Sequence, residues 1–196
     1  NSDELLSALG MSGTQSFGRW VFLGDGSTCK VLHPARAVVN GLDAAFLAKA
    51  GMTGPEHILE AEDGGLLAAM SDTGDIAKVS KGLGTDWDIL HMDMKPYPCC
   101  RSAHCAIDCS LKLRDSILEK IGKEYDHKTL EEERKRLTEA IREIEIKTYE
   151  VGYKQCAVSD GCLHPQNTMD AKFSIPFCTA AAFLFGKVNM SEFSDQ

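Results

Sequence analysis

Reactive side chains are concentrated in the segment KPYPCCRSAHCAIDC, which spans residues 95–109. Its composition suggests a zinc site, a redox dithiol, or a substrate-binding turn in which the thiols are bystanders. Structural zinc sites usually combine two closely spaced ligand pairs that a longer loop separates, and this chain has no CxxC pair. A redox dithiol has no better support, so we expect no metal and no other cofactor here. The zinc candidates that we disfavour are Cys99, Cys100, His104, Cys105 and Cys109.

The same segment contains residues that suit anion binding and proton transfer. We expect a helix over residues 102–121 with Ser102 as its N-cap, and the free N–H groups at a helix start favour anions. Arg101 adds a planar group that matches a carboxylate, and Lys95 adds a further positive charge. This field disfavours an imidazolium, which keeps His104 neutral and able to accept a proton. In the alternative interpretation, Arg101 pairs with a nearby acid and His104 only caps the helix.

A second cationic cluster occurs in the segment CKVLHPARA, where Lys30, His33 and Arg36 surround the expected start of another helix. The same anion argument applies to it. Basic residues near a helix start are more often simply solvated. Two such clusters in one chain make a functional role for each more plausible.

A third segment, HPQNTMDAKFSIPF, offers weaker candidates. His164 precedes a proline in a loop, where a histidine is usually structural. Lys172 and Ser174 come just before the last predicted helix, within reach of a substrate. Asp170 is expected to cap a helix or to pair with a cation.

Bulk composition excludes several classes of protein. The net charge of −8, from 21 basic and 29 acidic side chains, argues against a nucleic-acid groove. No apolar run reaches the roughly 20 residues that a membrane-spanning helix needs. The eight cysteines are too sparse for a disulfide-stabilised scaffold, so we expect a reducing compartment. This compartment would be the cytoplasm, or the mitochondrial matrix in a eukaryote.

Hydrophobic periodicity predicts that the first 75 residues are all helical. Pro34 stands in the first turn of the clearest helix and Gly51 follows its end. The apolar face of this helix consists of Val38, Leu42, Ala45 and Phe46. The other helices predicted in this part cover residues 3–18, 55–63 and 65–71.

The pattern changes beyond residue 84. Apolar and polar residues alternate over residues 87–94 and 142–151, which predicts two strands. The helices predicted in this part cover residues 102–121, 128–141 and 175–186, with a Thr129–Glu132 capping box, Ser174 as an N-cap and Gly186 as a stop. The predicted fold class is α+β, with an all-helical N-terminal part followed by an α+β part.

Four segments resemble the MmgE/PrpD family, also called the 2-methylcitrate dehydratase family, and they occur in the family's order. They are LGMSGTQSFG, KVLHPARAVVNGLDAAFLAKAGMTGPEHILE, KPYPCCRSAHCAIDC and HPQNTMDAKFSIPFCTAAAFLFG. The second and third segments are specific, whereas the first is weak alone. The resemblance covers about residues 5–188.

This resemblance implies a two-domain enzyme. Residues 1–88 would be the end of a helical domain and residues 89–196 much of an α+β lid. The upstream helices would be missing, so the chain is expected to be a fragment of a homodimeric protein. Family activities include dehydration of 2-methylcitrate, decarboxylation of cis-aconitate and epimerisation of iminodisuccinate. They act on small polycarboxylates without a metal cluster, which implies that the cysteines are bystanders.

The resemblance also implies roles for the two cationic clusters. Lys30 and His33 match the lysine and histidine of the family's second segment, and His104 matches the histidine of the lid. We assign Lys30, Arg36 and Arg101 to carboxylate binding, aided by His33 and Lys95. His104 is assigned to proton transfer, which Lys30 can share.

These roles predict a lyase that dehydrates a small di- or tricarboxylate. Isomerisation, epimerisation or decarboxylation of a similar substrate, and a non-catalytic binding module, stay open as alternatives. Decarboxylation is the less favoured of these reactions, because Phe177 stands where members of the family often have a tyrosine.

Overall fold

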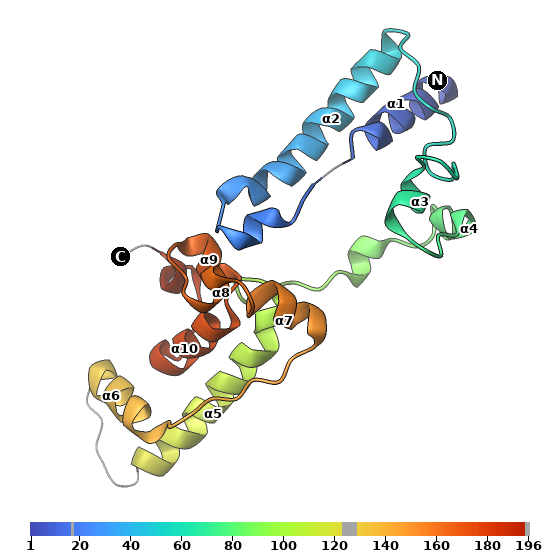
Figure 1. The fold of residues 1–196 in the computed structure, drawn as a ribbon. Helices are drawn as coiled ribbons and strands as arrows, with labels where there is room; N and C mark the ends of the chain where they lie inside the picture. Colours follow the sequence, from blue (N-terminus) through green and yellow to red (C-terminus); the bar gives the residue numbers. More distant parts are fainter. Residues whose placement is uncertain (17, 123–128, 195–196) are drawn as a thin grey trace. The chain divides into compact units, whose positions relative to one another are not determined.

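The structure is a computed structural model that describes residues 1–16, 18–122 and 129–194. The chain forms two compact units (Figure 1). Unit 1 consists of residues 1–19 and 29–93, and unit 2 consists of residues 20–28 and 94–196. The domain boundary expected between residues 88 and 89 stays a prediction.

Unit 1 is built on two helices that lie side by side, α1 (Ser2–Thr14) and α2 (Leu32–Lys49) (Figure 1). Asn1 and Glu4 form a capping box that satisfies N–H groups at the start of α1. The helices meet through a small core of Met11, Ala44 and Ala48. Short side chains at the contact allow the two backbones to approach closely.

The rest of unit 1 is mostly turns with short helices. The helix predicted over residues 55–63 is wrong, because only successive turns form there. The apolar turn predicted at residues 65–71 is confirmed as α3 (Leu66–Met70). The described part of unit 1 also contains α4 (Ile76–Val79), the 3-10 helix η3 (Asp88–His91) and most of the 3-10 helix η2 (Thr28–Val31), whose first residue belongs to unit 2.

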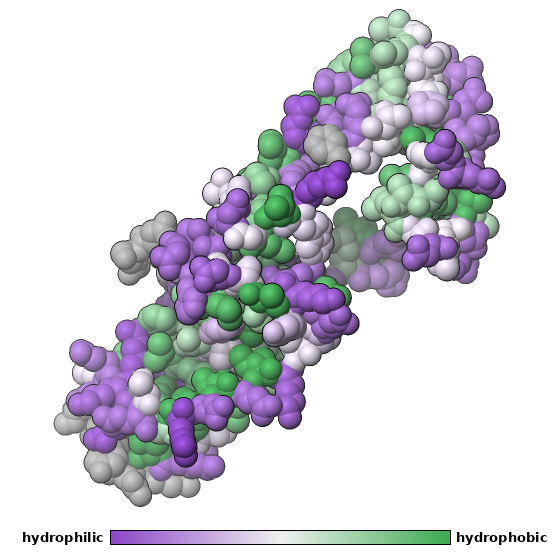
Figure 2. All heavy atoms as spheres, in the orientation of Figure 1, coloured by the Kyte–Doolittle hydropathy of each residue, from purple (hydrophilic) through white to green (hydrophobic). Residues whose placement is uncertain are grey.

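Apolar side chains reach the surface on α2. Val38, Leu42 and Phe46, expected to form one apolar face, are 64%, 56% and 69% exposed. The helix contacts α1 through its alanines instead, so this face is not covered by α1. Figure 2 shows apolar residues interspersed with polar ones over the visible surface. Within the described part of the chain, no helix is both long and apolar enough to cross a membrane.

Unit 2 packs its helices around α10 (Ile175–Phe185), which contacts α5 (His104–Gly122) and α6 (Leu130–Ala140). Ile107, Ile175 and Val188 are fully buried in its core. The shorter α-helices are α7 (Glu150–Cys156), α8 (Asp160–Leu163) and α9 (Thr168–Lys172). The 3-10 helices are η1 (Val21–Gly24), η4 (Arg101–Ala103) and η5 (Met190–Phe193).

Several predicted helix boundaries of unit 2 are confirmed. The Ser174 hydroxyl accepts a hydrogen bond from the Phe177 N–H and caps α10, and Gly186 ends that helix with φ 65°. Thr129 and Glu132 form the expected capping box of α6. Ser102 is not the N-cap of α5, because it lies inside η4 and its hydroxyl is 2.7 Å from the Tyr149 hydroxyl.

Both predicted strands are wrong. The first segment contains the 3-10 turn η3, and its alternating side chains Leu90, Met92 and Met94 are exposed. Most of the second segment connects α6 to α7 without regular secondary structure. Alternation favours an extended backbone, but a strand also needs a neighbouring strand for its hydrogen bonds. The α+β fold class is therefore wrong, since the described residues form helices, turns and loops without a strand, and their fold class is all-α.

Candidate active site around His104

His104 is the first residue of α5, directly after η4, and only 6% of it is exposed. The Tyr97 ring meets the imidazole edge to face, with ring centroids 5.2 Å apart and an interplanar angle of 88°. The Tyr97 hydroxyl donates a 2.6 Å hydrogen bond to Asp108 Oδ1, one turn further along α5. Tyr97 thus bridges two successive turns of this helix.

The tautomer of His104 follows from its hydrogen bonds. The Cys99 carbonyl accepts a hydrogen bond from Lys95 Nζ at 3.2 Å and another from the His104 ring. His104 Nε2 is buried and has no hydrogen-bond partner among the described residues, so the ring nitrogen that donates to Cys99 is Nδ1. In the neutral ring, the proton is then on Nδ1 and a lone pair is on Nε2. That lone pair is suited to accept a proton.

The surroundings of His104 favour its neutral form. Burial lowers the pKa of the imidazole most strongly, because the charged form loses hydration. The positive charges of Lys95 and Arg101 lower the pKa further, while the Cys99 carbonyl and the Asp108 carboxylate act in the opposite direction. The net shift is downward from the ordinary value of 6.5. His104 is therefore neutral at pH 7, and its Nε2 lone pair is enclosed by protein in this structure.

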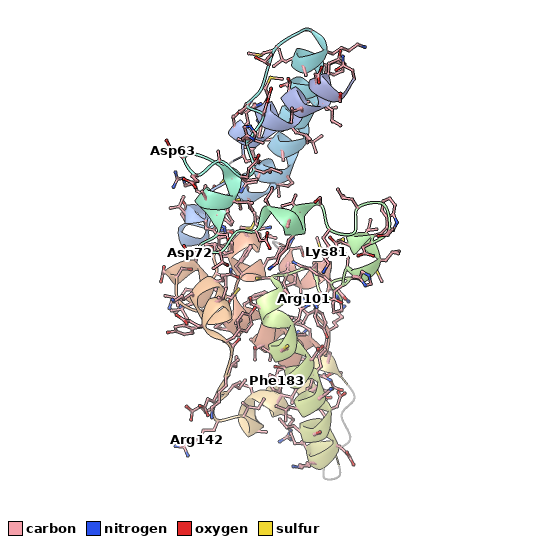
Figure 3. The ribbon with its side chains drawn as sticks, turned by 90° about the vertical axis from the view of Figure 1, so that its right-hand side faces the viewer. Asp63, Asp72, Lys81, Arg101, Arg142 and Phe183 are labelled. Atoms are coloured by element: carbon pink, nitrogen blue, oxygen red, sulfur yellow. The ribbon has the colours of Figure 1, made fainter. Side chains whose placement is uncertain are left out.

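Three of the predicted site residues come together at this junction. Lys95 precedes the turn, Arg101 opens η4 and His104 opens α5. Arg101 is exposed and lies near the N-terminal end of α5 in Figure 3. The cations and the base thus share one turn-to-helix segment, as their close spacing suggested.

The second cluster belongs to unit 1. Lys30 lies exposed in η2, and His33 and Arg36 lie in the first turns of α2. His33, Arg36 and Asn40 line a pocket of about 560 Å³ whose walls are α1, α2 and residues 56–66. Arg36 Nη2 donates a 3.2 Å hydrogen bond to Asn40 Oδ1, which orients the guanidinium along the helix. The role of this cluster in binding the same substrate as His104 stays a prediction.

Comparison with family models finds one match that contains Lys30 and another that contains His104. Residues 1–78 match the MmgE/PrpD N-terminal domain and residues 97–196 match the MmgE/PrpD C-terminal domain. The second match alone covers more than half of the chain.

The chain belongs to the MmgE/PrpD family. The sequence-based assignment to this family is therefore confirmed, and the family is of the dehydratase type. A comparison with curated proteins finds no match. The domain matches place Lys30, His33 and Arg36 in the N-terminal domain of this MmgE/PrpD protein, and Arg101 and His104 in its C-terminal domain.

In the third predicted segment, HPQNTMDAKFSIPF, Ser174 and Asp170 make contacts that stabilise the local fold. The Ser174 hydroxyl donates to the Cys162 carbonyl at 2.5 Å and is fully buried. The buried Asp170 carboxylate accepts a 2.9 Å hydrogen bond from Asn167 Nδ2. His164 is exposed after α8.

Lys172 differs from these residues, because it adjoins the His104 segment. Its carbonyl accepts a 2.8 Å hydrogen bond from the Cys100 N–H. Its positive charge helps to lower the pKa of the Cys99 thiol, after the larger effect of a hydrogen bond from Cys178. Lys172 thus adds a further cation close to the turn before η4.

The cysteines divide into an exposed and a buried set. Cys29, Cys105 and Cys109 are exposed, whereas Cys99, Cys156, Cys162 and Cys178 are buried and Cys100 is half-buried. The Cys156 thiol donates to Cys100, which lowers the pKa of Cys100 to about 5 and raises that of Cys156. Among the described residues there is no group of three or more potential ligands placed to hold a metal ion.

Tyr97 and Asp108 are not among the site residues that the sequence predicts. Asp108 lies four residues after His104, so the helical period places both on one face of α5. That spacing was a usable signal. Tyr97 lies between two prolines in a turn, and only the folded turn brings its ring onto His104.

Proposed function

We propose that this MmgE/PrpD chain carries the proton-transfer base of a lyase that dehydrates a small di- or tricarboxylate, such as 2-methylcitrate. The observation that supports this most strongly is the neutral, buried His104 with an unpaired Nε2. A base that is uncharged at pH 7 and held by a hydrogen bond on its other nitrogen is suited to general base catalysis.

In the proposed reaction, His104 Nε2 removes a proton from a carbon beside a substrate carboxylate. The C–H bonding pair forms the new C=C bond. The hydroxyl on the neighbouring carbon leaves with its own bonding pair and takes up a proton, so the products are an alkene and water. The hydroxide takes its proton from solvent, and protonated His104 later releases the substrate proton to solvent, so no net proton is gained or lost.

The cations have a complementary role in this proposal. Removal of a proton beside a carboxylate places negative charge on that carboxylate, and nearby positive groups stabilise it. We assign this role to Arg101, with Lys95 as a further binding residue. Lys30, Arg36 and His33 are also proposed to bind substrate carboxylate, as the family resemblance implies. Arginine suits a carboxylate because its planar group donates two parallel hydrogen bonds.

An epimerase remains the alternative, because it uses the same proton abstraction and returns the proton to the other face of the carbon. The same His104 geometry supports it. A decarboxylase is disfavoured, because Phe177 has no hydroxyl and its ring lies 5.7 Å from that of Phe193. Product analysis separates dehydration from epimerisation, since only dehydration releases water and an alkene, which lowers the mass of the substrate.

The decisive experiment compares wild-type protein and His104→Ala, with 2-methylcitrate, citrate, cis-aconitate and iminodisuccinate as candidate substrates. Loss of a general base should lower kcat by ~10²-fold or more. Products are followed by mass spectrometry. Equal turnover in the variant would remove His104 from the mechanism.

A binding assay separates a catalytic site from a non-catalytic binding module. A bound polycarboxylate stabilises the folded chain by RT ln(1 + [L]/Kd), which raises Tm. A rise in Tm without turnover would favour the binding module, and no rise with any of the four compounds would contradict a formed site.

We further propose a homodimer in a reducing compartment, the cytoplasm or the mitochondrial matrix. The family resemblance supports the dimer, and the cysteine content supports the compartment. Light scattering coupled to size exclusion measures the mass of the assembly. A monomer at micromolar concentration would contradict the dimer.

A further inference from the structure

The contacts of His104 extend to two side chains that no assignment so far includes, Tyr97 and Asp108. We propose that they are positioning residues, which hold the imidazole of His104 in one orientation with its lone pair on Nε2. This inference rests on the proposed function, because it gives the two residues their purpose. Neither residue is assigned a contact with the reacting atoms.

Three connected contacts support the inference. The Tyr97 ring fixes one side of the imidazole at 5.2 Å between centroids. The Tyr97 hydroxyl is tied to Asp108 Oδ1 at 2.6 Å, so the phenol cannot rotate away without losing that bond. The Cys99 carbonyl restrains Nδ1. An edge-to-face ring contact and one hydrogen bond together define the plane of an imidazole ring.

The Tyr97–Asp108 pair is itself strongly constrained. Partial burial raises the pKa of the Tyr97 phenol to about 12, and the hydrogen bond to Asp108 acts in the same direction. The phenol therefore stays protonated across the physiological range, so it can donate to the Asp108 carboxylate throughout that range.

The charged and titratable groups around His104 come from each neighbouring element. Lys95 lies in the preceding turn, Arg101 in η4, and Asp108 on α5 itself. Tyr97 is neutral and excludes water from one side of the ring. Removal of its ring should admit water and raise the pKa of His104 towards the ordinary value, because burial is the main cause of the lowered pKa.

The first test compares Tyr97→Leu with Tyr97→Phe. Leucine keeps an apolar side chain but removes the ring, whereas phenylalanine keeps the ring and removes the hydroxyl. NMR titration of ¹⁵N-labelled histidine measures the pKa and the tautomer of His104 in each protein. We expect a raised pKa and a mixed tautomer in Tyr97→Leu, and a smaller change in the same direction in Tyr97→Phe, which keeps the ring and loses only the hydrogen bond to Asp108. An unchanged pKa and tautomer in Tyr97→Leu would overturn the inference.

The kinetic arm uses the same variants with the substrate that wild type turns over. Misplacement of the base should lower kcat of Tyr97→Leu by roughly 10-fold or more and leave its KM nearly unchanged, with a smaller loss of kcat in Tyr97→Phe. A rise in KM at constant kcat would contradict a positioning role. If wild type turns over none of the four polycarboxylates, the proposed function fails, while the NMR titration still decides whether Tyr97 positions His104.

Asp108 provides a second test that does not depend on the folding of a Tyr97 variant. It is exposed on α5, so both Asp108→Ala and Asp108→Asn should fold. The asparagine amide oxygen can still accept the Tyr97 hydrogen bond, and alanine cannot. We expect Asp108→Ala to shift the His104 tautomer and Asp108→Asn to retain it. Equal behaviour of the two variants would overturn the part of the inference that concerns Asp108.

Discussion

At the scale of single residues, the main feature is a histidine whose surroundings favour the neutral ring. His104 is buried between Tyr97 and the Cys99 carbonyl, near two positive charges. The sequence predicted a neutral His104 from the field of a helix start. Burial is the larger cause in the structure, and it depends on the turn that places Tyr97 over the ring.

This arrangement makes stability depend on pH. The folded pKa of His104 lies below its ordinary value of 6.5, so the unfolded chain binds more protons as the pH falls through 6.5. The free energy of unfolding should therefore rise with pH up to about 6.5, and it should fall as the medium becomes more acidic. Urea unfolding between pH 5 and 8 measures this dependence.

The variant His104→Gln is the control for that measurement, because it removes the titrating group. Its free energy of unfolding should depend less steeply on pH than that of wild type. His57, whose pKa is raised by a hydrogen bond from its ring to Glu60, contributes with the opposite sign but is common to both proteins. Identical pH profiles would show that His104 is not held neutral by the fold.

At the scale of elements, close contacts decide which helices pack. Gly10 on α1 lies directly against the backbone of Pro55, so a Cβ there would overlap with the Pro55 carbonyl. Gly41 on α2 has open space around it. Both glycines lie inside an α-helix, but only at Gly10 would an added Cβ meet the backbone of another segment. Gly41 is therefore a matched control for Gly10.

We expect Gly10→Ala to lower the free energy of unfolding by about 1–3 kcal/mol, because overpacking against backbone cannot relax easily. Gly41→Ala should raise it by about 0.5–1 kcal/mol, since alanine is the better helix former. Hydrogen exchange should speed up in α1 and α2 for Gly10→Ala alone. Equal effects of the two substitutions would contradict the close approach of α1 and Pro55.

At the scale of the whole molecule, the cysteines report on folding. The three exposed thiols should react quickly with iodoacetamide in the native chain. Four buried thiols should react only after denaturation, and the half-buried Cys100 should react faster than its exposure alone would give, because its lowered pKa keeps it as a thiolate at neutral pH. Mass spectrometry of alkylated peptides gives the order. Similar rates at all eight positions would show that the core of unit 2 does not form.

Local signals in the sequence predicted much of the helical framework. The helix after Pro34, the capping box at Thr129 and the Ser174 and Gly186 ends of α10 are all confirmed, because capping depends on neighbouring residues. The motifs also determined the family. The two strands were wrong because alternation describes only the chain itself, whereas a strand depends on a partner elsewhere.

The sequence by itself therefore determined the MmgE/PrpD family, the main helices and the concentration of cations and a histidine before α5. The tertiary structure decided which nitrogen of His104 is free, and that Tyr97 and Asp108 support the ring. It also decided that the face of α2 with Val38 and Phe46 is exposed. The physical reason is range: capping and periodicity act over one or two helical turns, whereas burial and ring contacts depend on how the turns and helices fold onto one another.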